Sequence, residues 1–330
     1  MSILIFFFII QSITEIPFLE QPVSQKPDER IYCEFTFSVT SKIKTEDIYN
    51  PGSIKYLNDH IYVSDYKPYH RVLKLDPSNG DILITFGKQH GQGPEDIGHL
   101  TGFDITENGD LWIADYGNSR LAVFNQDGKS EMVILNNKIP YKISGKSTSD
   151  IIAVKTDLSS KLFLLNKSEM ILWESEELVA NPQKWSNIIT GFVILLDNNE
   201  AIQIGNHAGY IAKYNNQGKL DYIRMPVAHR HKTIGNPVPG LDHLVYNVNR
   251  QNLDYAIANG FAYKDKLVLF VQHMGDNRFQ TLDIYSISDG SYQYSYRLPE
   301  SFRDIDISET GTLVGIKPEG EIQIWQLDKL

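Results

Sequence analysis

Residues 91–128 read GQGPEDIGHLTGFDITENGDLWIADYGNSRLAVFNQDG, and an MVIL run follows at 132–135. Short runs of β-favouring residues at 100–106, 111–114, 121–124 and 132–135 alternate with turn-forming residues. At the first turn, Asn108 and Gly109 form the Asn-Gly pair that supplies the positive φ angles of a tight hairpin. Four short strands with a turn about every 8–12 residues predict one small antiparallel sheet.

Weaker versions of this unit recur along the chain. We predict full four-stranded units at about 53–86, 100–135, 141–173, 185–224 and 255–298. A lone strand at 34–40 precedes them, and three strands at 302–308, 312–316 and 321–327 follow. If these two ends complete one shared unit, the ring closes and no sheet edge is left exposed at the junction. The sequence therefore predicts an all-β fold: a six-bladed β-propeller of four-stranded antiparallel blades, the last blade closed by an N-terminal strand.

The second unit resembles an NHL repeat. The matching positions are Gly91, Gly93 and Pro94 in the lead-in, Gly109 in the turn, Ile113, Ala114 and Asp115 at a strand end, and Asn118 and Arg120 before the third strand. The first unit carries a looser copy at 61–65 and 71–76, with Lys67-Pro68 where the family has Gly-Asn. The resemblance implies the propeller fold. An acid that ends one strand and an Arg that opens the next can pair and cap turn amides, so we expect a structural role for Asp115 and Arg120.

Composition limits the classes of partner. The chain has 330 residues, 42% of them hydrophobic and 22% charged, which is enough apolar content for a large core. The formal net charge is −10 and no long basic cluster occurs, so we expect neither nucleic acid nor an anionic membrane as partner. Cys33 is the single cysteine, which excludes a disulfide within the chain and a cysteine-based metal site. We expect a monomer.

The amino-terminal segment has an export-like pattern. The apolar run ILIFFFII at 3–10 is too short to span a bilayer and has the length of a signal-peptide core, although no Lys or Arg precedes it. Residues 11–30 are polar and contain three prolines, as in a tether. We predict a signal-like tether at 1–30, a propeller at 31–330, and an exported protein, periplasmic or at the cell surface. Lipidation of Cys33 is not expected, because Ile31 and Tyr32 precede it instead of a small residue.

The longest interruption of the repeats is 225–254, between the fourth and fifth units, and long loops of this kind often bind ligands. Our candidate ligand-binding residues lie in it and at the ends of the two units it joins: His207, His229, Arg230, His231, His243 and His273. Histidines that meet at the mouth of the channel could bind a divalent metal or act as acid–base groups. Arg230 between two histidines favours the plainer interpretation of a solvated basic loop, so we predict no cofactor and keep a divalent metal as the alternative.

Three functions are compatible with these patterns. The first is non-catalytic binding of a peptide, protein or small ligand at the channel mouth and the 225–254 loop. The second is a metal-dependent lactonase, another hydrolase or a lyase acting at the central channel, because such enzymes are built on similar propellers. The third is a carbohydrate-binding or sensor subunit of a surface complex. Tyr292, Tyr294 and Tyr296 alternate along one strand, which predicts a shared aromatic face, although such rows more often serve cross-strand packing.

Overall fold

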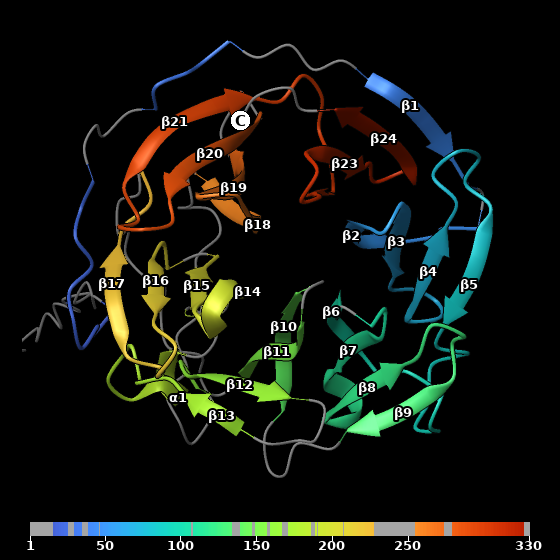
Figure 1. Ribbon diagram of the computed structural model, residues 1–330, viewed down its shortest axis with the longest axis horizontal. Coiled ribbons are helices and arrows are strands. Elements are labelled where there is room, and N and C mark those ends of the chain that lie inside the picture. The colour runs from blue at the N-terminus through green and yellow to red at the C-terminus, as the bar shows by residue number, and fades with distance from the viewer. Residues whose placement is uncertain are drawn as a thin grey trace, which may run out of the picture.

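The computed structural model describes residues 16–25, 30–34, 39–45, 47–106, 108–133, 139–146, 149–156, 159–166, 171–185, 189, 191–206, 208–227, 255–273 and 279–326. These residues form six four-stranded antiparallel sheets arranged as blades around a central axis (Figure 1). The six-bladed propeller predicted from the sequence is thereby confirmed.

Each blade is a meander whose first strand lies nearest the axis. Blade 1 is β2 (Pro51–Leu57), β3 (His60–Asp65), β4 (Arg71–Leu75) and β5 (Ile82–Phe86). Blade 2 is β6 (Leu100–Ile105), β7 (Leu111–Asp115), β8 (Arg120–Phe124) and β9 (Ser130–Val133). Blade 3 is β10 (Pro140–Lys146), β11 (Ser149–Thr156), β12 (Leu162–Asn166) and β13 (Ile171–Glu174). Blade 4 is β14 (Gly191–Leu195), β15 (Ala201–Gly205), β16 (Ile211–Tyr214) and β17 (Leu220–Arg224). Blade 5 is β18 (Tyr255–Tyr263), β19 (Lys266–His273), β20 (Gln280–Ser286) and β21 (Tyr292–Arg297).

Blade 6 closes the ring with strands from both ends of the propeller. It comprises β22 (Asp304–Ile307), β23 (Thr312–Ile316), β24 (Glu321–Gln326) and, outermost, β1 (Val39–Lys44). The closing strand therefore lies a few residues later than the predicted 34–40, of which 35–38 are outside the described residues. Ile43 explains the shift, because its side chain fills the apolar gap between blades 6 and 1.

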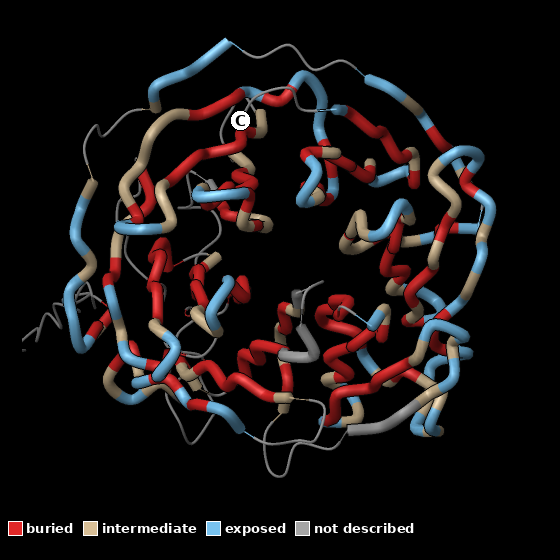
Figure 2. Tube along the Cα trace, in the orientation of Figure 1, coloured by how far each residue is buried: buried red, intermediate tan, exposed pale blue. Residues whose placement is uncertain are grey.

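The core lies between the blades. Six apolar clusters, one in each gap between neighbouring blades, contain most of the buried side chains. Because both faces of a blade pack, the middle strands β7 and β8 are buried at every position instead of alternating. Figure 2 shows the same pattern, with buried residues along the middle of the blades and exposed residues at the outer turns.

The start of the fourth blade also differs from the prediction. We expected it near Trp185, but Pro182–Trp185 form the short helix α1 and the inner strand β14 begins at Gly191. Trp185 is 4% exposed and belongs to the cluster between blades 3 and 4, so its role is packing.

Residues 16–25 and 30–34, which we call the strap, run around the outside of blades 3 to 5 (Figure 1). Phe18 packs in the core cluster of blades 3 and 4, and Val23 pairs with Arg224 at the outer edge of β17. Arg30 forms a buried ion pair with Asp283 of β20, Nε to Oδ2 at 2.8 Å. The described part of the expected tether is thus packed against the propeller, while the division of the chain at residue 31 stays a prediction. No helix among the described residues is long and apolar enough to cross a membrane.

Candidate functional site

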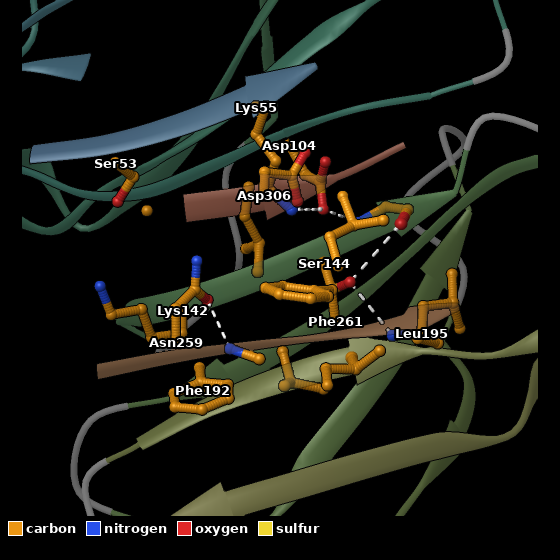
Figure 3. A pocket seen from close by; sticks show the side chains of 18 of the residues that line it. Ser53, Lys55, Asp104, Lys142, Ser144, Phe192, Leu195, Asn259, Phe261 and Asp306 are labelled. Atoms are coloured by element: carbon orange, nitrogen blue, oxygen red, sulfur yellow. Dashed lines mark hydrogen bonds and ion pairs between the residues drawn. The ribbon is translucent and has the colours of Figure 1, made fainter. Parts of the chain in front are cut away.

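A cavity of about 740 Å³ occupies the centre of the ring. The inner strands of all six blades contribute to its wall (Figure 3). The wall mixes apolar with polar and charged side chains, and the following polar or charged residues interrupt the inner strands at mid-channel: Lys55, Asp104, Ser144, Asn259, Asp304 and Asp306. A wall of this kind suits a ligand with both apolar and polar parts.

Lys55 lies between carboxylates from the two neighbouring blades (Figure 3). Its Nζ is 3.3 Å from Oδ2 of Asp104. Burial lowers the pKa of Lys55, but the negative charges of Asp104, Asp306 and Asp304 outweigh it, so that pKa is raised overall. Lys55 is therefore charged throughout the physiological pH range.

Two of the carboxyl groups are held against ionisation. Burial raises the pKa of Asp304 to about 7, although the Ile54 N–H and Asn259 donate hydrogen bonds to it. Burial likewise raises the pKa of Asp306 to about 6, against the opposing charge of Lys55. Both pKa values thus lie much closer to neutrality than that of an exposed aspartate.

The polar groups at mid-channel also join neighbouring blades. Oδ2 of Asp304 accepts from the Ile54 N–H at 3.0 Å, and Oδ2 of Asp306 accepts from the Tyr56 N–H at 2.9 Å. Two residues along β22 thus match two residues along β2, so these inner strands run in the same direction.

The same kind of bond links other blades. Asp104 accepts from the Gly145 N–H at 3.0 Å, and Ser144 Oγ accepts from the Leu195 N–H at 3.1 Å (Figure 3). Asn259 donates to Oδ1 of Asp304 at 2.8 Å, which joins blades 5 and 6. The channel acids therefore satisfy main-chain donors that the inner strands would otherwise leave unpaired in the wall.

Two further cations line the cavity where inner strands begin. Lys142 is the third residue of β10 and Arg303 immediately precedes β22. Arg303 is exposed and Lys142 is half-buried, with its Nζ donating to the Thr101 carbonyl. Phe192 lines the same cavity (Figure 3). Lys142 belongs to blade 3 and Arg303 to blade 6, on opposite sides of the ring, so the cavity offers two separate places for an anionic group.

Of the six residues of the predicted histidine site, only His273 lies among the residues that the structure describes. His207, His229, Arg230, His231 and His243 lie outside the described residues. His273 ends β19, stacks on Phe279 with ring centroids 4.0 Å apart, and has Nε2 3.3 Å from Thr281 Oγ1. Burial, with Arg30 and Arg297, lowers the pKa of His273 to about 4. It does not line the channel cavity.

The predicted tyrosine face is interrupted. Tyr294 and Tyr296 pack in the gap between blades 5 and 6, but Tyr292 packs in the gap between blades 4 and 5. The cause is a β-bulge, because the register with β20 shifts between the pairs Ile284–Tyr294 and Tyr285–Tyr292. Because of the extra residue, the Tyr292 side chain lies on the opposite face of the sheet from Tyr294 and Tyr296.

Asp115 and Arg120 have the structural role expected of them. Arg120 Nε is 3.0 Å from Oδ2 of Asp115, and its Nη2 donates to the Gly93 and Asp96 carbonyls at 2.8 and 2.6 Å. Asn118 donates to the Gly91 carbonyl at 2.9 Å. The conspicuous residues of the repeat thus fix the connection between blades 1 and 2.

Sequence reasoning missed the mid-channel residues Lys55, Asp104, Asp304 and Asp306. A signal was present: a charged residue interrupts the apolar inner strand in GFDIT at 102–106 and in DIDI at 304–307. Such an interruption at the most buried strand of a blade indicates either a ligand contact or a paired structural charge.

Fold and channel define the class of protein, a six-bladed β-propeller that contains an NHL repeat. The NHL repeat family model matches residues 99–124. Comparison of the sequence with curated proteins gives no match.

Similar solved structures are propellers of low sequence identity. One, from Bacteroides fragilis, carries the description of an exported protein; it has 14% identity and a TM-score of 0.57, over 93% of this chain and 99% of that one. Virginiamycin B lyase from Staphylococcus aureus has 12% identity and a TM-score of 0.55, over 88% of this chain and all of the other. A duf4221 family member from Bacteroides vulgatus has 10% identity and a TM-score of 0.54, over 88% of this chain and 97% of that one. At these identities the likeness concerns the fold alone.

Proposed function

We propose that the protein binds a short peptide or small molecule in the central channel, with an anionic group of the ligand at Lys142 or at Arg303, and that it does not convert the ligand. The single observation that carries this proposal is that the acidic and the basic side chains of the channel differ in what they contact. Asp104, Asp304 and Asp306 accept hydrogen bonds from neighbouring inner strands. Lys142 and Arg303 also line the cavity, and Arg303 is exposed.

The surroundings of the two cations support an amphipathic ligand. Phe192 and Phe261 lie in the same wall, so a ligand can gain apolar contact beside its charged group. Attraction between an anion and a cation in a partly enclosed channel exceeds that of the same charges on an open surface. Export is part of the proposal, supported by the signal-like run at 3–10 and by the description of the Bacteroides fragilis relative.

The test uses two peptide mixtures. N-acetylated random tetrapeptides with free C-terminal carboxylates, and the same peptides as C-terminal amides, are equilibrated with the protein by dialysis and identified by mass spectrometry. We expect retention of the carboxylate series only. The double variant Lys142→Ala/Arg303→Ala should lose it, whereas Lys129→Ala/Lys219→Ala, which removes the same charge from exposed outer turns, should retain it. Equal retention of acids and amides, or no retention by the parent protein, would contradict the proposal.

The second candidate is a hydrolase or lyase acting in the channel. The raised pKa of Asp304, about 7, favours it, since a carboxyl that titrates near neutral pH suits acid–base catalysis. Both oxygens of Asp304 already accept hydrogen bonds, which favours binding over chemistry. The dialysis experiment separates the two functions, because a catalyst changes the mass of the recovered peptide or of an added lactone or ester.

A further inference from the structure

Three histidines that sequence reasoning did not single out lie together at the junction of blades 1 and 2. His70 ends the connection between β3 and β4, and His90 and His99 lie in the connection between β5 and β6. The ring centroid of His70 is 5.4 Å from that of His90 and 5.2 Å from that of His99. We call these three residues the histidine cluster. It adjoins the channel through Tyr66, which lines the cavity and whose ring centroid is 6.5 Å from that of His70.

The fold holds the backbone of this cluster in place. Oδ1 of Asp115 accepts from the Gly98 and His99 N–H groups at 2.9 and 3.0 Å. The Arg120 bonds described above fix the same connection at Gly93 and Asp96. These bonds of the NHL repeat hold the backbone of the loop that carries His90 and His99, as a preorganised site requires.

Within the cluster, His70 has a nitrogen without a partner. The residue is 9% exposed, and its Nδ1 is buried with no hydrogen-bond partner. Burial lowers the pKa of His70, with His99, His90 and Lys67 acting in the same direction and Asp115 against it. A buried imidazole nitrogen without a partner is a candidate metal ligand.

The separation of the rings suits a shared metal ion. Two imidazoles bound to one tetrahedral zinc ion through nitrogens at about 2.0–2.1 Å have ring centroids on the order of 5 Å apart. As they stand, no three His, Cys, Asp or Glu side chains of the described residues have ligand atoms gathered closely enough to hold a metal. His90 and His99 are both exposed, however, so their rings can turn toward His70 without disturbing the core.

We infer that His70, His90 and His99 form a binding site for a borderline transition-metal ion such as Zn²⁺, with a fourth coordination position open to water or to a ligand. Imidazole nitrogens suit zinc, copper and nickel better than calcium or magnesium. This site differs from the one predicted around the 225–254 segment, and it does not depend on the proposed peptide binding.

The test titrates the metal-free protein with Co²⁺ at pH 7.5, followed by visible absorption, with Zn²⁺ as competitor. We expect one equivalent per chain. His99→Ala and His90→Ala, which alter exposed side chains and leave the fold intact, should each weaken Co²⁺ binding by more than about ten-fold. The matched control is His60→Ala, which removes a histidine from the first position of β3. A thermal melt of each variant verifies folding.

The outcomes are separable. One equivalent of Co²⁺ that is lost in His90→Ala and His99→Ala but kept in His60→Ala supports the site. No stoichiometric binding, or binding unaffected by His90→Ala and His99→Ala, overturns it. Binding that disappears only in His229→Ala/His231→Ala also overturns it, because the ion would then be held by the 225–254 segment. None of these readouts involves peptide retention.

Discussion

Replacing Arg120 of blade 2 by Ala should destabilise the propeller more than replacing the corresponding Arg71 of blade 1 by Ala. The Arg120 side chain is 6% exposed and its partner Asp115 is fully buried. Removing the guanidinium leaves the Asp115 carboxylate without a counter-charge, and breaking a buried pair in this way typically costs about 3–5 kcal/mol. Asp115 keeps the hydrogen bonds from the Gly98 and His99 N–H groups. We therefore expect a loss near the lower end, about 3 kcal/mol.

The first blade supplies a matched control. Arg71 pairs with the buried Asp65 at 3.1 Å and donates to the Asp47 carbonyl, which repeats the arrangement of blade 2. The Arg71 side chain is 15% exposed, so water can reach the carboxylate once the side chain is removed. We expect Arg71→Ala to cost about 1–2 kcal/mol.

Urea unfolding measures both losses. Trp112 is buried in β7, the strand that Asp115 ends, and its fluorescence contributes to the signal of the four tryptophans. Adding Asp115→Asn to Arg120→Ala should recover part of the loss, because it removes the uncompensated charge. The reasoning is refuted if Arg120→Ala costs no more than Arg71→Ala, or if the double variant is less stable than Arg120→Ala alone.

Three further changes have defined outcomes. The folded pKa of Asp304, about 7, exceeds its ordinary value of 3.8, so its contribution to stability is complete below pH 4 and is lost as the pH rises to about 7. Asp304→Asn should therefore remove this pH dependence: the stability of the parent relative to the variant should fall by about 2–3 kcal/mol from pH 5 to pH 8, measured by urea unfolding at each pH. Gly191→Ala brings a Cβ within 1.7 Å of the facing strand's carbonyl and should cost about 3 kcal/mol or more. At Gly102 the nearest atom to an added Cβ is a Lys142 methylene at 3.4 Å, which is ordinary contact, so Gly102→Ala should fold normally in a thermal melt. Arg30→Ala leaves Asp283 buried and unpaired, so limited proteolysis should cut the strap sooner than in the parent; equal cleavage rates would contradict a holding role for this pair.

Local patterns were sufficient to predict the ring. Strand and turn signals repeat within each blade, and the residues matching the NHL pattern, such as Asp115 and Arg120, act within one blade and its lead-in. The number of blades and their closure by an N-terminal strand follow from counting these units. Element ends were less accurate, as at Trp185, because a buried aromatic residue fits a packed helical turn as well as a strand.

The channel and the histidine cluster depend on contacts between distant segments. Lys55 and Asp304 are separated by most of the chain, and only closure of the ring brings them together. A single inserted residue in β21 moved Tyr292 out of the predicted aromatic face, and no local pattern marks such a bulge. His70 and His90 lie in short connections of the usual kind within and between blades. The prediction favoured the histidines of 225–254 instead, because that loop is the longest.

The shared blade has a consequence for synthesis. Of the described strands, β1 leaves the ribosome first, whereas its partner β24 leaves last. Throughout translation of the intervening blades, β1 has no partner along its edge, and an unpaired edge strand invites association with other chains. The strap contacts blades 3 to 5, which emerge before blade 6 is complete. If the strap docks on them during synthesis, it holds β1 close to the gap that β22, β23 and β24 later fill.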